Sequence, residues 1–250
     1  MTGVVIGAIL VAAGLPWYVG VVVLVVVGAG VAVWIWSRSP ASVLASIDAR
    51  PSDEDERPRL HNLVDGLCAT MGLPRPSICV VDSTVPNAMA LGRDPARASL
   101  VVTSSLDEVL TLVELEGVLA HELVHIKRHD TVLAGVAVTV SIPWTMLRGV
   151  SVGADRVHTL IGRGRGFDAD QRAARVVRYP PGIASALARV TDGSDRASRP
   201  APSSWPTGTR RAAEITRWLW FDPMAGPAED ESMEGNLDDT RVRAAALSLY

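Results

Sequence analysis

The chain has 250 residues, enough for one compact domain with accessory segments, and 48% of them are hydrophobic, a high share for a soluble protein. Its formal net charge of −3 gives no basic field, so we expect no nucleic-acid partner. The two cysteines, Cys68 and Cys79, lack CxxC spacing, which argues against a disulfide framework and against a cysteine-based zinc module.

The first 36 residues have the composition of a membrane segment, because they contain no charged side chain. A helix from Trp17 to Trp36 would rise about 28 Å, close to the roughly 30 Å of a hydrocarbon core. Residues 4–15 would cover only about 18 Å, so we expect one or two transmembrane helices within 1–36. Arginines follow from Arg38 onward, and the positive-inside rule then predicts a plasma-membrane protein whose downstream domain faces the cytoplasm.

Residues 37–59 contain several prolines and an acidic cluster, which predict a juxtamembrane linker. A folded domain is expected from residue 60 to residue 250. Its first apolar residues recur at helical spacing over 60–72, and the apolar runs 78–81 and 100–103 are typical of strands. We therefore predict a mainly helical α+β fold in which a small β-sheet packs on a helix that carries the site residues.

Two capping-box patterns follow the second predicted strand: Ser105 with Glu108, and Thr111 with Glu114. They predict a short helix and then a longer one that ends near Lys127. Leucine and isoleucine side chains recur along the longer helix at spacings of three and four, so this helix should pack against the core.

The second half of the predicted domain begins with an uncharged run, residues 131–147, which is broken by Pro143. At about 25 Å this run is marginal as a membrane span, and we favour a non-crossing or re-entrant segment. A glycine-rich loop at 162–166 and a helix over 169–178 are expected next. The Ser, Pro, Gly and Arg content of residues 191–209 predicts a mobile surface loop.

The longer predicted helix carries the sequence HELVH, an HExxH motif. His121 and His125 lie one helical turn apart on the same face, so two imidazole nitrogens can converge on one Zn²⁺. Glu122 lies beside them and can take a proton from metal-bound water, which makes it the candidate general base. A pair of exposed surface histidines is the alternative. Asp130 either orients a histidine or closes the helix.

The run ELEGVLAHELVHIKRHD, residues 114–130, resembles the active-site helix of the HtpX and CAAX-protease group of membrane zinc peptidases. PNAMALGRDP at 86–95 and LWFDP at 219–223 are also similar to segments of this group. The resemblance extends over roughly residues 60–250. It implies a membrane-bound endopeptidase with one zinc per chain that cleaves membrane or misfolded proteins. It also implies that residues 88–91 pair with an extended substrate by β-addition.

The sequence departs from this group in two ways. The group usually supplies a third zinc ligand from a glutamate three residues before an Ala-Asp pair, and here Gly166 stands at that position. If the segment is helical, Asp170 is the better substitute because it lies one turn from Gly166 on the same face, and Asp168 becomes available only if the segment unwinds. Alternatively, both aspartates are ordinary solvated residues. The second departure is that only one hydrophobic run, 131–147, precedes this position, where the group usually has two.

Two functions follow from these observations. The first is an active zinc endopeptidase with Glu122 as general base. The second is a catalytically degenerate member that acts as a membrane binding or regulatory protein, which the glycine at position 166 favours. A membrane scaffold with an accidental HExxH is a third, weaker alternative. The partners expected for the first function are protein or peptide substrates and the lipid bilayer.

Overall fold

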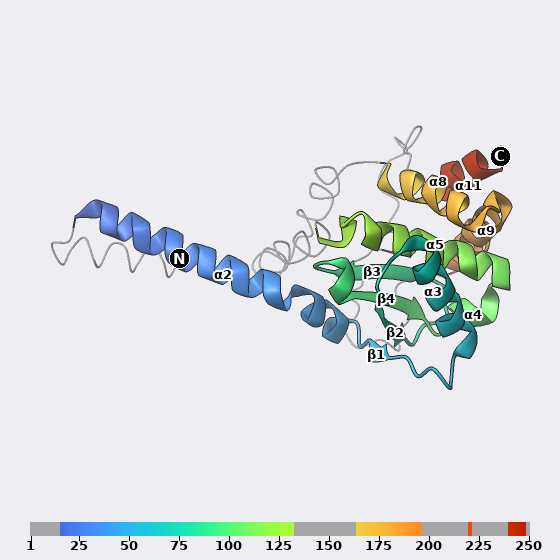
Figure 1. Ribbon diagram of the computed structural model, residues 1–250, viewed down its shortest axis with the longest axis horizontal. Coiled ribbons are helices and arrows are strands. Elements are labelled where there is room, and N and C mark those ends of the chain that lie inside the picture. Colours follow the sequence, from blue (N-terminus) through green and yellow to red (C-terminus); the bar gives the residue numbers. More distant parts are fainter. Residues whose placement is uncertain (1–15, 133–163, 197–219, 222–239, 249–250) are drawn as a thin grey trace. The chain divides into compact units, whose positions relative to one another are not determined.

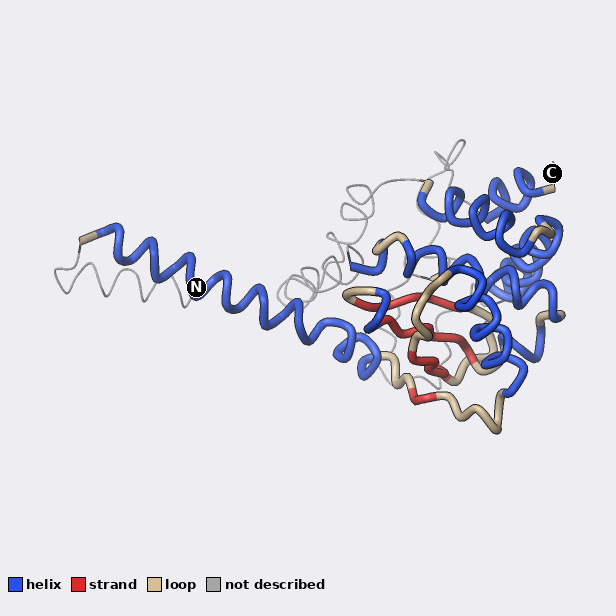
Figure 2. The backbone as a smooth tube through the Cα atoms, viewed as in Figure 1, coloured by secondary structure: helices blue, strands red, loops and turns tan. Residues whose placement is uncertain are grey.

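The computed structural model describes residues 16–132, 164–196, 220–221 and 240–248 (Figure 1). The chain divides into two units, Met1–Ser39 and Pro40–Tyr250. The described helices are α2 (Trp17–Ser46), α3 (Pro58–Met71), the 3-10 helix η1 (Pro95–Arg97), α4 (Leu106–Val109), α5 (Leu112–Lys127), α8 (Arg165–Val177), α9 (Pro180–Arg196) and α11 (Thr240–Leu247). The strands are β1 (Arg50–Pro51), β2 (Ser77–Val81), β3 (Ala88–Gly92) and β4 (Ala98–Thr103). The predicted mainly helical fold with a small sheet is therefore confirmed (Figure 2).

Helix α2 is 30 residues long and extends ten residues beyond the helix predicted at Trp17–Trp36. Several of its apolar side chains are more than half exposed, including Val25 at 62% and Val26 at 64%. By length and hydropathy, no helix within the described residues qualifies as a membrane span. The transmembrane segment predicted in residues 1–36 is thus not found there, and residues 1–15 lie outside the described part of the chain.

Residues 37–59, predicted as a linker, carry regular structure. Helix α2 continues to Ser46 with Pro40 inside it, and the side chain of Val43 is buried against the sheet. Strand β1 then pairs antiparallel with β2, with Arg50 opposite Val80. The folded unit therefore begins at Pro40 rather than at residue 60.

The four strands form one sheet in the order β1-β2-β4-β3. The two predicted strands are β2 and β4, which lie side by side and parallel, whereas β3 pairs antiparallel with β4. The sheet is covered on both faces. Alternate residues of β2 show this, because Ile78 and Val80 join the core beneath α5 while Cys79 and Val81 join a second cluster with Val43. Burial on both faces explains the continuous apolar runs in these strands.

Helix α5 lies between the sheet and an outer layer of helices (Figure 1). It contacts β3 and β4 on one side and α8 and α9 on the other, and α11 packs on α8 and α9. The approach to α9 is close, since a Cβ atom added at Gly117 would lie 2.7 Å from Cγ1 of Ile183. The helix with the HExxH motif is consequently surrounded by packed elements along most of its length.

The start of α5 is fixed by local chemistry. Thr111 is its N-cap residue, and the predicted capping box with Glu114 is present in both directions. The short helix predicted from Ser105 is present as α4 with Ser105 as its N-cap residue, but the Ser105 side chain makes no capping hydrogen bond.

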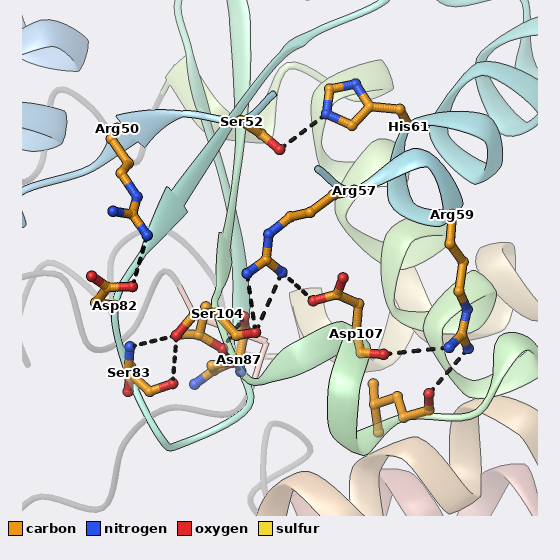
Figure 3. A network of polar contacts seen from close by, with 12 residues as sticks. Arg50, Ser52, Arg57, Arg59, His61, Asp82, Ser83, Asn87, Ser104 and Asp107 are labelled. Atoms are coloured by element: carbon orange, nitrogen blue, oxygen red, sulfur yellow. Dashed lines mark hydrogen bonds and ion pairs between the residues drawn. The ribbon is translucent and has the colours of Figure 1, made fainter. Parts of the chain in front are cut away.

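Two arginines at the start of α3 fix the short helix that precedes α5 (Figure 3). Arg57 pairs with Asp107 and donates to the Ser104 carbonyl at 3.3 Å. Arg59 donates to the Leu110 carbonyl at 3.1 Å, just after the last residue of α4. Arg57 thus holds the start of α4, and Arg59 satisfies a carbonyl group just after its end, in the turn between α4 and α5.

Three predictions for the second half of the domain need correction or cannot be compared. The loop predicted at 162–166 gives way to α8 from Arg165, after Gly164 in a left-handed conformation. The mobile loop predicted at 191–209 is helical as far as Arg196, and the rest of it lies outside the described residues. The apolar segment 131–147 is described only in its first two residues.

Candidate active site

The HExxH side chains lie on the buried part of α5. His121 is 2% exposed and Glu122 is 1% exposed. The Nε2 atoms of His121 and His125 face each other at 3.1 Å. Two nitrogens that bind one tetrahedral Zn²⁺ at its usual bond length are about 3.3 Å apart. The spacing of the two imidazoles therefore suits a shared zinc ion.

Each histidine is held from its other nitrogen by an aspartate. His121 Nδ1 lies 2.6 Å from Oδ1 of Asp170, and His125 Nδ1 lies 3.1 Å from Oδ2 of Asp130. Burial alone would raise the pKa of Asp170, but Arg243 and His121 outweigh it and hold the pKa at about 2. An ionised carboxylate can only accept, so each Nδ1 carries the proton and each Nε2 presents a lone pair.

The two lone pairs face each other without protons to separate them. Burial lowers the pKa of His121 to about 4, against the opposing effect of Asp170, and burial also lowers the pKa of His125. Both rings are therefore neutral near neutral pH. Two lone pairs at 3.1 Å repel each other unless a cation lies between them, so the arrangement is suited to binding a metal ion.

Glu122 follows His121 on α5, and its carboxyl group is buried. Burial raises its pKa to about 8, although Arg243 and a hydrogen bond from the Ala90 backbone oppose the shift. Its Oε1 atom has no hydrogen-bond partner among the described residues. A group with such a pKa can both accept and release a proton near neutral pH, as a general acid-base catalyst must.

Asp170 does not occupy the ligand position predicted for it. Its Oδ1 accepts from His121 Nδ1, and both of its oxygens accept from Arg243 at 2.6 and 2.9 Å. Asp170 thus contacts the Nδ1 side of the His121 ring and not the Nε2 side, and its hydrogen bond orients the ring. Asp168 is no substitute, because α8 is helical here and Asp168 pairs with Arg172 on the exposed face. Asp130, by contrast, has the contact with His125 that an orienting role requires.

Sequence reasoning missed two neighbours of the site. Arg243 is 73 residues from Asp170 along the chain, and no motif surrounds it. Phe221 packs its ring against that of His121 at 4.9 Å in an edge-to-face arrangement. The LWFDP segment that contains Phe221 was noted only for its resemblance to the HtpX group.

The donor set fits zinc in type and spacing, but it is incomplete within the described residues. Two imidazole nitrogens converge, and each has a carboxylate behind it, as is usual for zinc-binding histidines. No group of three potential ligand side chains is found in the part of the chain that the structure describes.

The outer edge of β3 lies beside the site and is partly occupied. Phe221 donates its backbone N–H to the Ala88 carbonyl at 2.7 Å, and Trp220 forms a bridge with Met89. Substrate pairing along the whole of residues 88–91, as implied by the resemblance, is therefore incompatible with this arrangement. Residues 90–92 form the remaining part of that strand.

Comparison with known proteins identifies the family. Residues 54–219 match peptidase family M48. A protease HtpX homologue from Salinibacter ruber is 34% identical over 199 residues, which are 71% of this chain and 70% of that protein. Homologues of the same name from Tropheryma whipplei and Pyrococcus furiosus are 36% and 31% identical over 57% and 62% of this chain. The chain spans 59% and 63% of the length of these two proteins. The chain belongs to peptidase family M48.

Proposed function

We propose that this member of peptidase family M48 is an active zinc-dependent endopeptidase. In this proposal His121 and His125 bind the metal and Glu122 is the general base. The observation that supports it best is the pair of Nε2 atoms at 3.1 Å, each directed by an aspartate on the opposite nitrogen. Neutral imidazoles in this arrangement need a cation between them.

In the proposed reaction each residue of the site would have a distinct role. Bound zinc would supply a polarised water molecule and a polarised substrate carbonyl. Glu122 would take the proton from the attacking water and pass it to the departing amine. Bound zinc would favour the ionised carboxylate, against the burial that raises its pKa to about 8 in the metal-free protein. Asp170 and Asp130 would keep both Nδ1 atoms protonated, so that the Nε2 lone pairs stay directed at the metal.

We also propose that the protein works at the plasma membrane, with its catalytic unit in the cytoplasm and membrane or misfolded proteins as substrates. Support comes from α2, where residues 17–37 contain no charged side chain and valine side chains are exposed. Arg38 follows this run, as the positive-inside rule requires for a cytoplasmic catalytic unit. A catalytically degenerate protein, the alternative favoured by Gly166, gains no support from the relatives, which are all named proteases.

The test uses the full-length protein, purified in detergent, with metal analysis and a casein cleavage assay. We expect about one zinc per chain and cleavage by the wild type. Glu122→Gln should abolish cleavage and keep the zinc, whereas His125→Ala should lose both. Glu116→Gln is the matched control, because Glu116 is a partly exposed glutamate on the same helix and should behave like the wild type. A metal-free wild type, or normal cleavage by Glu122→Gln, would overturn the proposal.

A further inference from the structure

We propose that Arg243 on α11 is a positioning residue of the zinc site, which acts on His121 through Asp170. This inference rests on the proposed function, because it concerns how that site is held together. The guanidinium of Arg243 lies directly over Gly166, where a Cβ atom would be 3.3 Å from Cζ and 3.4 Å from Nε. A cation thus fills the space in which a side chain at position 166 would begin.

The contacts of Arg243 connect three helices. Its Nε donates to Asp170 Oδ2 at 2.6 Å and its Nη2 donates to Oδ1 at 2.9 Å, which is a two-pronged pair between α11 and α8. Asp170 then accepts from His121 Nδ1 on α5. Arg243 also donates to the Phe221 carbonyl at 2.8 Å, and Phe221 packs on the His121 ring. Arg243 therefore contacts two residues, Asp170 and Phe221, that each contact His121.

Both members of the ion pair are buried, Arg243 at 2% exposure and Asp170 at 1%. A buried charge is costly unless it is paired and hydrogen-bonded, so neither side chain can turn away without leaving the other unsatisfied. The rigid fork of the guanidinium fixes both carboxylate oxygens at once. The direction of the carboxylate, and with it the direction of the His121 ring, is consequently set by Arg243.

The position of the Arg243 guanidinium requires a glycine at position 166. Any larger residue at this position would meet the guanidinium at a distance that is tighter than ordinary van der Waals contact, so Arg243 would have to shift by a few tenths of an ångström. Such a shift would change the hydrogen bonds to Asp170 although the new side chain touches no proposed metal ligand. Gly166 and Arg243 should therefore act as a coupled pair.

Arg243 can affect zinc binding by positioning His121 or by its positive charge, and the two effects predict opposite changes in zinc affinity when Arg243 is removed. A guanidinium near the site repels a bound cation, so its removal should tighten zinc binding if only charge matters. If Arg243 positions His121, its removal should weaken zinc binding by about 10-fold or more, as does the loss of other partners that hold a ligand. The sign of the change in affinity therefore distinguishes the two effects.

The experiment is a zinc titration of the full-length protein in detergent, with a thermal melt of each variant. We expect Arg243→Gln to bind zinc about 10-fold more weakly, and Arg243→Lys to fall between it and the wild type, because lysine keeps the charge but loses the fork. Gly166→Ala should also weaken zinc binding, because the added methyl group would displace the guanidinium of Arg243 from Asp170.

Arg172→Gln is the control, because it removes an arginine from the exposed face of α8 and should leave zinc affinity unchanged. Unchanged or tighter zinc binding in both Arg243→Gln and Gly166→Ala would overturn the inference. A wild type that binds no zinc would instead refute the proposed function, so the two failures can be told apart.

Discussion

Replacement of Glu122 by glutamine should stabilise the metal-free protein, and the gain should increase with pH. The cause is the burial of this carboxyl group, which raises its pKa from the ordinary value of 4.5 to about 8. A group whose pKa is raised on folding contributes its full stability below pH 4.5 and loses it as the pH rises through about 8. Glutamine has nearly the same shape and no charge, so it avoids this loss.

The magnitude follows from the two pKa values. A difference of 1.36 kcal/mol accompanies each tenfold change in proton affinity, so at about pH 7 the wild type should lose roughly 3 kcal/mol relative to acidic conditions. Above about pH 8 the folded carboxyl also ionises, and the loss levels off at somewhat more than this value. The difference in unfolding free energy between Glu122→Gln and the wild type should therefore grow by about 3 kcal/mol from acidic to neutral pH.

The assay is urea unfolding of chelator-treated, full-length protein in detergent at about pH 5, 7 and 9. Only the difference between the variant and the wild type matters, because other titrating groups affect both proteins alike. Glu116→Gln, a change on the same helix, should show no comparable dependence on pH. If the difference for Glu122→Gln were the same at all three pH values, Glu122 would not be a desolvated carboxyl group, and the raised pKa would be refuted.

Three further predictions concern the packing around the site. Asp170→Ala should lower zinc affinity by 10-fold or more and should lower the unfolding free energy by about 3–5 kcal/mol, since Arg243 would be left as an unpaired buried charge; an unchanged zinc titration would refute its role. Gly117→Ala should destabilise the protein by about 1–3 kcal/mol, because the new methyl group meets Ile183, and a higher melting temperature would contradict this. Thr111→Ala should cost about 1 kcal/mol through the lost N-cap, measured by the same unfolding assay.

The features that could be predicted from the sequence are local ones. The capping box of Thr111 and the one-turn spacing of His121 and His125 depend only on residues three or four positions apart. The partner of His121 is 49 residues away on another helix, so its sequence position alone suggested a metal ligand rather than a support. Arg243 carries no pattern at all, and its role depends entirely on how α11 packs.

The wrong boundaries also have physical reasons. The prolines of residues 37–59 predict a linker, but α2 continues through Pro40 and Val43 is buried in the second cluster beside the sheet. Gly166 was assigned to a loop because glycine disfavours helices. In the structure it lies in the first turn of α8, and the buried guanidinium of Arg243 occupies the space that its missing side chain leaves. Tertiary packing overrides the local preference in both cases.

The two edges of the sheet are both protected against pairing with another chain. Strand β1 has two residues and ends in Pro51, which has no N–H to donate, and β3 is partly covered by Trp220 and Phe221. A long free edge would attract any unfolded polypeptide that exposes a strand of its own. Under the proposed function, misfolded substrates would block the enzyme if they bound along such an edge, so the short and covered edges should confine them to the part of β3 that contacts Glu122.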